Sequence, residues 1–113
     1  SYGVGILLGQ ETIEFIGDKF KFIELDKIAV KGKSEGITVY TITSLPFNYI
    51  GHSLFLKYYK GREWIQAKRA VTALLKENTP LRDYYKMMME RLEELEKNDP
   101  GEDWDHVFRL KTK

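Results

Sequence analysis

Hydrophobic positions divide the chain into a strand-rich first part and a helical second part. Up to about residue 43, β-branched and aromatic residues occur in short runs between glycines, which is typical of strands and turns. From about residue 46, apolar residues recur every three or four positions, which is typical of amphipathic helices. The pattern therefore predicts an α+β protein with two regions, residues 1–43 and a helical region over residues 44–113.

The first region begins with an expected strand and a short helix. An apolar run between glycines predicts a buried strand over Val4–Leu8. The next residues predict a helix over Gln10–Ile16, which Gly17 would end in the left-handed conformation.

Two longer strands are expected to pair antiparallel across a turn that contains glycine. The hydrophobic alternation over Phe20–Val30 changes phase twice, so we expect a bulge or kink between Phe22 and Lys27. Ile37–Ile42 reads as the returning strand, and the glycines of the turn can take positive φ without strain.

Three apolar stripes predict three helices after residue 43, and Pro46 would begin the first of them. The stripe of the first helix consists of Phe47, Ile50, Leu54 and Tyr58, and Gly61 ends it. The stripe of the second consists of Trp64, Ala67, Val71, Leu74 and Leu75. Thr79 and Pro80 would begin the third, whose stripe consists of Leu81, Tyr84, Tyr85, Met88, Leu92 and Leu95. The apolar tail is expected to pack on the helices through Trp104, Val107, Phe108 and Leu110.

Composition narrows the classes of function. The 18 basic and 17 acidic residues nearly cancel, which argues against a general nucleic-acid binder. The chain has no cysteine, which excludes disulfides and thiolate metal sites and suits a reducing cytoplasm. No apolar run is long enough to span a bilayer, so no membrane contact is expected from this segment. The start without methionine leads us to expect an excised fragment.

The basic turn between the two longer strands is the first candidate for chemistry. Gly32 lies between Lys31 and Lys33, so a polyphosphate can approach the backbone while ammonium groups neutralise it. The alternative is a solvated hairpin turn whose lysines keep the strands from pairing with other chains.

Two carboxylates and two histidines are weaker candidates. Glu24 and Asp26 would share one face of a regular strand and could bind a metal, but they also fit an ordinary strand end. His52 and His106 lie in different elements, and we expect His52 to be a surface or hydrogen-bonded boundary residue. These residues therefore predict no catalytic group and no metal ligand in this chain.

The strand pair resembles the last strand pair of class III nucleotide cyclases. The matching residues are Glu24-Leu25-Asp26, Ile28, Val30-Lys31-Gly32-Lys33 and Val39-Tyr40. Asp103-Trp104-Asp105-His106-Val107 resembles the Asp-Trp-Asp-Gly-Val tail of bacterial adenylate cyclases, with His106 in place of the glycine. Gly36 stands where family members often have proline. Tyr58, Trp64 and Ala67 are similar in spacing to one tetratricopeptide-like helix pair.

The resemblance implies the C-terminal end of an adenylate or guanylate cyclase, a phosphorus-oxygen lyase of bacterial signal transduction. It implies that Lys31 contacts the triphosphate of the nucleoside triphosphate, whether ATP or GTP. It also implies that the parent is a homodimer with Mg²⁺ or Mn²⁺ held by aspartates upstream of residue 1. The fragment alone is then expected to bind no cofactor and to be inactive. A cytoplasmic location is expected, and the resemblance also allows a parent anchored in a membrane through upstream segments.

A different class of function also fits the residues. The helical region would then be a protein-interaction or dimerisation module without a catalytic role, contacting a partner or the upstream cyclase domain. A single tetratricopeptide-like helix pair cannot bury both of its faces, so it must pack on something else.

Overall fold

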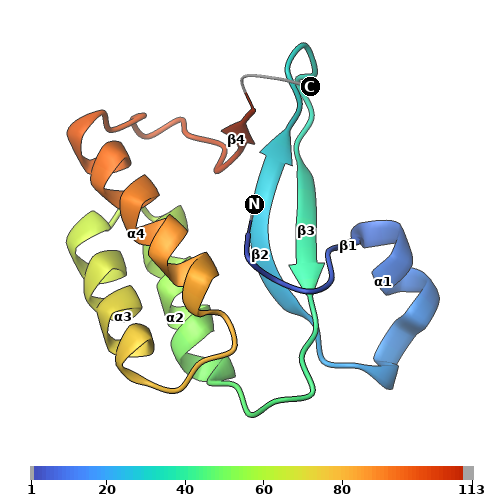
Figure 1. Cartoon of the computed structure of the whole chain (residues 1–113). Helices are drawn as coiled ribbons and strands as arrows, with labels where there is room; N and C mark the ends of the chain where they lie inside the picture. Colours follow the sequence, from blue (N-terminus) through green and yellow to red (C-terminus); the bar gives the residue numbers. More distant parts are fainter. Residues whose placement is uncertain (1, 111–113) are drawn as a thin grey trace. The chain divides into compact units, whose positions relative to one another are not determined.

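The sheet is built around a hairpin of the two longest strands. The structure is a computed structural model that describes residues 2–110. In it, β2 (Ile23–Ala29) and β3 (Ile37–Thr41) pair antiparallel, which confirms the predicted strand pair (Figure 1). A short strand, β1 (Leu8–Gly9), joins β3 antiparallel, and β4 (Phe108–Arg109) joins β2 in parallel. The strand order is therefore β1-β3-β2-β4, and the protein is α+β.

The expected irregularity in β2 is a change of register. Glu24 lies opposite Tyr40 and Asp26 lies opposite Val39, so Leu25 is the extra residue. An extra residue breaks the strict alternation of a strand, and two consecutive side chains can then be buried. Leu25 and Asp26 are both buried, which confirms the predicted bulge between residues 22 and 27.

The first expected strand is much shorter than predicted. Only residues 8 and 9 pair with β3, whereas Ile6 and Leu7 are about half exposed. The carbonyl of Ile6 accepts a hydrogen bond of 2.7 Å from the Thr41 hydroxyl, so a side chain satisfies it where a strand would use a backbone N–H. The prediction of a buried strand over residues 4–8 is therefore wrong.

The short helix of the first region has the predicted bounds. α1 covers Gln10–Ile16, and a single 3-10 turn, η1 (Gly17–Lys19), follows it. Gly17 has a positive φ of 70° but a ψ of −141°, which lies outside the left-handed helical region. The glycine therefore ends α1 as expected, although in a different conformation.

Three helices form the second region, as predicted. α2 (Tyr49–Lys60) packs on α3 (Trp64–Lys76), and α3 packs on α4 (Arg82–Lys97) (Figure 1). Within residues 2–110, none of the helices is long and apolar enough to cross a membrane.

Two helices begin later than the prolines suggested. Asn48 caps α2, because its side chain accepts a hydrogen bond of 2.8 Å from the backbone N–H of Gly51. Before α4, the hydroxyl of Thr79 accepts a hydrogen bond of 3.1 Å from the backbone N–H of Leu81. A side-chain cap therefore sets the start of α2, three residues after Pro46, and α4 begins at Arg82, two residues after Pro80.

The buried face of α2 differs from the prediction. His52, Phe55 and Tyr59 are buried, whereas Ile50 is 85% exposed and Leu54 is 43% exposed. The observed face is turned from the predicted one by about one residue, or about 100° of rotation. Apolar residues occur on all sides of α2, so the sequence pattern did not determine which side is buried. In the structure, the aromatic side chains lie on the buried side.

The other two stripes are confirmed except at one residue each. The buried residues of α3 are Trp64, Ala67, Val71 and Leu74. Those of α4, with the residue before it, are Leu81, Tyr84, Tyr85, Met88 and Leu92. Leu75 and Leu95 are only half-buried. The spacing of apolar residues therefore decided the packing of α3 and α4.

The ends of the chain do not follow the division at residue 43. Residues 2–4 belong to the same compact unit as residues 43–103, and the aromatic ring of Tyr2 lies 6.3 Å from that of Tyr84. Residues 104–110 belong with residues 5–42. The tail was expected to pack on the helices, but its strand β4 pairs with β2. Backbone hydrogen bonds to a sheet edge therefore fix the tail.

The buried face of α2 predicts effects of different size for two truncations. We expect Phe55→Ala to lower the free energy of unfolding by about 3–5 kcal/mol, because Phe55 is fully buried. Ile50→Ala should change it by less than about 0.5 kcal/mol, because its side chain is exposed. Urea titrations followed by circular dichroism check both, and a larger loss for Ile50→Ala would contradict the observed face.

Candidate functional site

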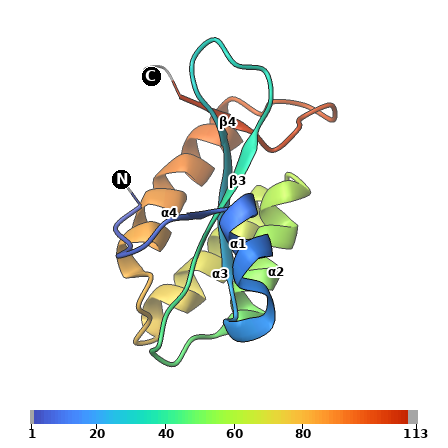
Figure 2. The same ribbon diagram turned by 90° about the vertical axis from the view of Figure 1, so that its right-hand side faces the viewer.

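The turn between β2 and β3 presents the lysine that the sequence singled out. The backbone N–H of Lys33 donates a hydrogen bond of 3.0 Å to the carbonyl of Val30, which closes a four-residue turn. Gly32 has a φ of 87° at the third position of that turn, as a type II turn requires. Lys31 and Lys33 are both exposed, and the loop extends beyond the strands (Figure 2). An anion in solvent can therefore reach Lys31.

The two carboxylates of β2 do not form a pair. Oδ1 of Asp26 accepts a hydrogen bond of 2.9 Å from the backbone N–H of Lys27, and the bulge separates Asp26 from the face of Glu24. Glu24 lies opposite Tyr40, where burial and, to a lesser extent, the charge of Glu24 raise the pKa of the Tyr40 hydroxyl. The two carboxylates therefore lie in different surroundings and do not form a pair that could bind one ligand.

The described residues contain no group suited to a resident metal ion. Between residues 2 and 110, no three side chains of histidine, cysteine, aspartate or glutamate come together where they could hold one. Divalent metals prefer several oxygen ligands, which Glu24 and Asp26 alone do not supply. These residues do not fit the Mg²⁺ or Mn²⁺ of a cyclase, and the upstream metal ligands stay a prediction.

The tail packs against the hairpin that carries Lys31. Val107 is buried, and a Cβ placed on Gly36 would lie 2.7 Å from its Cγ2 atom. Just beyond, Phe108 lies opposite Ile28 in the parallel pairing of β4 with β2. The backbone N–H of Leu110 extends this pairing by donating a hydrogen bond of 2.8 Å to the carbonyl of residue 29. Glycine is therefore required at position 36 by the close approach of the tail.

A carboxylate in the tail sets the course of its backbone. Asp105 accepts a hydrogen bond of 3.0 Å from the backbone N–H of Val107 and forms an ion pair of 2.7 Å with Arg109. The Arg109 side chain, followed by the Val107 N–H, lowers the pKa of Asp105. His106 between them has a φ of 67°, a conformation that glycine adopts more readily than histidine. The backbone therefore turns tightly at His106, where the resembling tail has glycine.

The buried histidine belongs to the helical core. His52 is 4% exposed, and its Nδ1 atom shares a hydrogen bond of 2.8 Å with the Tyr85 hydroxyl. Burial and, second, the charge of Glu77 raise the pKa of Tyr85 far above its usual value, so the hydroxyl keeps its proton and can donate it. His52 is hydrogen-bonded as expected, but it lies in the interior and not at the boundary.

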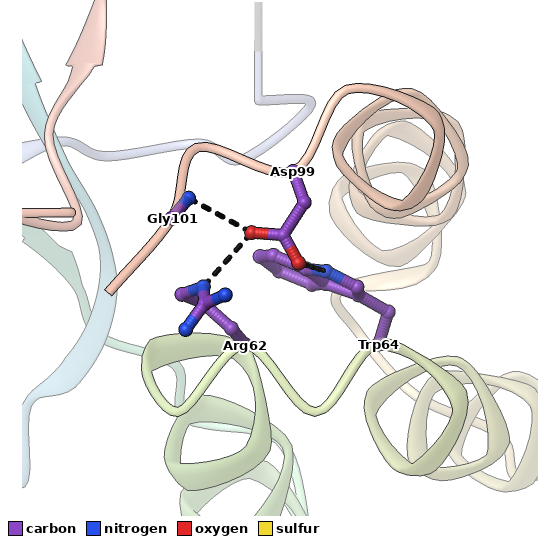
Figure 3. Close-up of polar contacts among 4 residues, drawn as sticks. All are labelled: Arg62, Trp64, Asp99 and Gly101. Carbon is purple, nitrogen blue, oxygen red and sulfur yellow. Dashed lines mark hydrogen bonds and ion pairs between the residues drawn. The ribbon is translucent and has the colours of Figure 1, made fainter. Parts of the chain in front are cut away.

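A polar group with three hydrogen-bond donors in the helical unit was not predicted. Asp99 accepts hydrogen bonds from Arg62 Nε at 2.8 Å, the Gly101 backbone N–H at 2.9 Å and Trp64 Nε1 at 2.9 Å (Figure 3). These contacts join the α2–α3 turn to the segment after α4. The Arg62 hydrogen bond, followed by those of Gly101 and Trp64, lowers the pKa of Asp99 to about 2. Three donors occupy this carboxylate, so it acts as a structural tie and not as a base or ligand.

The pKa of Asp99 predicts where acid breaks this tie. The folded value of about 2 lies below the ordinary 3.8, so the stabilisation is present above pH 4 and is lost as pH falls through about 2. We expect the indole N–H resonance of Trp64 to shift with a midpoint near pH 2 in an NMR titration. Asp99→Asn should abolish this shift and Asp103→Asn should leave it. A midpoint near 4 would contradict the arrangement.

Comparison with known proteins gave no relative. Searches against protein-family models, curated proteins and solved structures returned no match to this chain.

Proposed function

We propose that this chain is the C-terminal portion of a class III adenylate or guanylate cyclase in which Lys31 contacts the triphosphate of the nucleotide. The observation that carries this proposal is the packing of the tail on the Lys31 hairpin. The two segments with the resemblance, residues 20–40 and 103–107, are far apart in sequence. Nevertheless, Val107 lies against Gly36 and β4 pairs with β2. A shared structural role explains why both patterns occur in one chain.

The chemistry assigned to Lys31 is neutralisation of charge on the leaving group. In the parent, the ribose 3′-oxygen would bond to the α-phosphorus, pyrophosphate would leave, and the hydroxyl proton would pass to solvent. Negative charge then grows on the pyrophosphate, where an ammonium group stabilises it. The exposed position of Lys31 and the positive φ of Gly32 suit a close approach to phosphate oxygens. Divalent metals bound upstream would supply further charge neutralisation.

Exposed apolar residues in the strand unit also support a larger parent domain. Several large side chains there are about half exposed or more: Ile6, Leu7, Phe15, Phe20 and Ile37. Phe15 is the extreme case, with 91% of its surface exposed. Large apolar side chains exposed in this number suit a contact with another part of a protein. In our proposal, the upstream catalytic domain covers it in a cytoplasmic homodimeric parent.

The proposal predicts that the isolated chain is inactive. Incubation of residues 1–113 with ATP or GTP and Mn²⁺ should produce no cyclic nucleotide, because the metal ligands and base-selecting residues of the family would lie upstream. Liquid chromatography with mass spectrometry measures the product, and an active class III cyclase serves as the positive control. Cyclic nucleotide formed by the purified chain would overturn the proposal that it is only a portion of the enzyme.

A chimeric enzyme tests the role of Lys31. The last strand pair and tail of an active class III cyclase would be replaced with residues 1–113. We expect Lys31→Ala to lower kcat/KM by about tenfold or more, because a hydrogen bond to a charged group contributes about 1.5–3 kcal/mol. Initial rates of cyclic AMP formation measure the effect.

The neighbouring lysine provides the matched control. Lys33 lies in the same exposed turn and carries the same charge, but the resemblance assigns it no contact. Lys33→Ala should therefore change kcat/KM by less than about threefold. Equal losses for the two variants would indicate a general charge effect and would contradict a specific contact at Lys31.

A protein-interaction module is the second candidate function, and the exposed face of α2 favours it. Ile50 and Leu54 face solvent on α2, and Ile65 is 54% exposed on α3. A helix pair that buries one aromatic face and exposes a second apolar face has a surface available for a partner. We infer that α2 and α3 form such a module, whether or not the chain comes from a cyclase.

A further inference from the structure

The solvent side of α2 and α3 carries several exposed or half-buried apolar residues. On α2, they are Ile50, Leu54 and Tyr58, which are spaced one helical turn apart. On α3, they include Ile65 and, further along, Ala73. We call this surface the outer α2–α3 face. It belongs entirely to the helical unit.

Two shallow hollows lie on this face, on either side of Arg69. The first, of about 320 Å³, lies between the helices and is lined by Leu54, Tyr58, Gln66, Arg69 and Ala70. The second, of about 510 Å³, follows α3 and is lined by Ile65, Lys68, Arg69, Thr72, Ala73 and Lys76. Two alanines and a threonine are among the lining residues, and their short side chains leave room for the side chains of another molecule. Arg69 contributes to both hollows.

All charges on the two helices have one sign. α2 and α3 contain five basic residues and no acidic residue: Lys57, Lys60, Lys68, Arg69 and Lys76. Glu96 of α4 already pairs with Lys68. The guanidinium of Arg69 and the ammonium of Lys76 line the hollows themselves. The face therefore combines apolar hollows with positive charge, which is complementary to an apolar and acidic surface.

We propose that the outer α2–α3 face binds an acidic amphipathic helix of a protein partner. This inference deepens the second candidate function and rests on it. Apolar side chains of the partner fill the two hollows, and carboxylates one turn away pair with Arg69 and Lys76. Helix binding in an apolar groove uses such anchors at positions i, i+3, i+4 and i+7. Arg69 would fix the orientation of the bound helix, because a guanidinium can bind a carboxylate through two hydrogen bonds.

A second copy of this chain fits the face less well. Two outer α2–α3 faces meeting about a two-fold axis would bring six basic side chains together, those of Lys68, Arg69 and Lys76 from each copy. The acidic residues of α4, such as Glu90 and Glu93, have no large exposed apolar residue beside them on that helix. They could supply carboxylates but no side chains for the hollows. A partner needs both features on one surface.

Calorimetry with three matched peptides tests the partner's chemistry. Each peptide has about 14 residues, roughly four helical turns, with leucines on one face. The other positions are glutamate in the first, glutamine in the second and lysine in the third. The full chain should bind the glutamate peptide at least about tenfold more tightly than the glutamine peptide, and the lysine peptide least. Binding of the glutamate peptide should weaken as salt is raised.

Charge-reversal variants locate the site. Arg69→Glu should weaken binding of the glutamate peptide by about tenfold or more, and Arg69→Lys should weaken it less because one positive charge remains. Lys86→Glu makes the same change of charge at an exposed position of α4 and should leave the affinity within about twofold. Thermal unfolding of each variant confirms that the helices remain folded. Equal losses for Arg69→Glu and Lys86→Glu would overturn the proposed site.

The results of the peptide experiments distinguish failure of the acidic-helix proposal from failure of the interaction-module function on which it rests. Tighter binding of the glutamine or lysine peptide would refute the acidic partner but leave an interaction module in place. No binding of any peptide would refute both. Vesicles with phosphatidylserine are a further arm, since basic residues beside apolar ones also suit anionic lipid. Vesicle binding that Arg69→Glu abolishes, without binding of the glutamate peptide, would assign the face to a membrane and overturn the proposal.

Discussion

The hydrogen bond between His52 and Tyr85 is the constraint on which the arrangement of the helical unit depends. It joins a buried ring nitrogen of α2 to a buried hydroxyl of α4, and each group would be costly to bury without its partner. Phe55 packs beside this pair, with its ring 5.8 Å from that of His52. Once His52 and Phe55 point inward, helical geometry places Ile50 and Leu54 outside. The proposed partner surface is therefore a consequence of the core.

In the strand unit, one close approach joins the tail to the hairpin. Val107 lies where a side chain on Gly36 would be, and Asp105 holds the turn that brings it there. The parallel pairing of the short strand β4 with β2 completes the attachment. The tail thus supports the hairpin from which Lys31 projects.

The two proposals rest on different units and on different physical effects. The proposed contact of Lys31 with phosphate depends on one charge on an exposed turn. The positive φ of Gly32 shapes this turn so that an anion can approach it. The contact of the helical face with a partner combines apolar hollows with a charge pattern spread over two helices. Either can hold without the other, because neither uses a residue of the other unit. The polar tie at Asp99 serves neither and instead fixes the end of α4.

The local features of the fold followed from the sequence. Alternation and its interruption predicted the hairpin and the bulge of β2, and glycine beside lysine placed Lys31 on an exposed turn. These features depend on residues that are close together in the sequence, so the local pattern of residues is sufficient to predict them. An acid placed two residues before a glycine, as at Asp99, could have indicated a turn, but not the bonds to Arg62 and Trp64.

Only the tertiary structure decided which face of α2 is buried, where the tail attaches and what Asp99 binds. α2 is apolar on both sides, so its burial depends on which side chains fill the space beside α3 and α4. The few apolar residues of the tail did not determine where it packs. Its backbone pairing with β2 fixes its position. Asp99 meets Arg62 and Trp64 across more than thirty residues of chain. Contacts between distant segments depend on packing, which no local spacing of residues encodes.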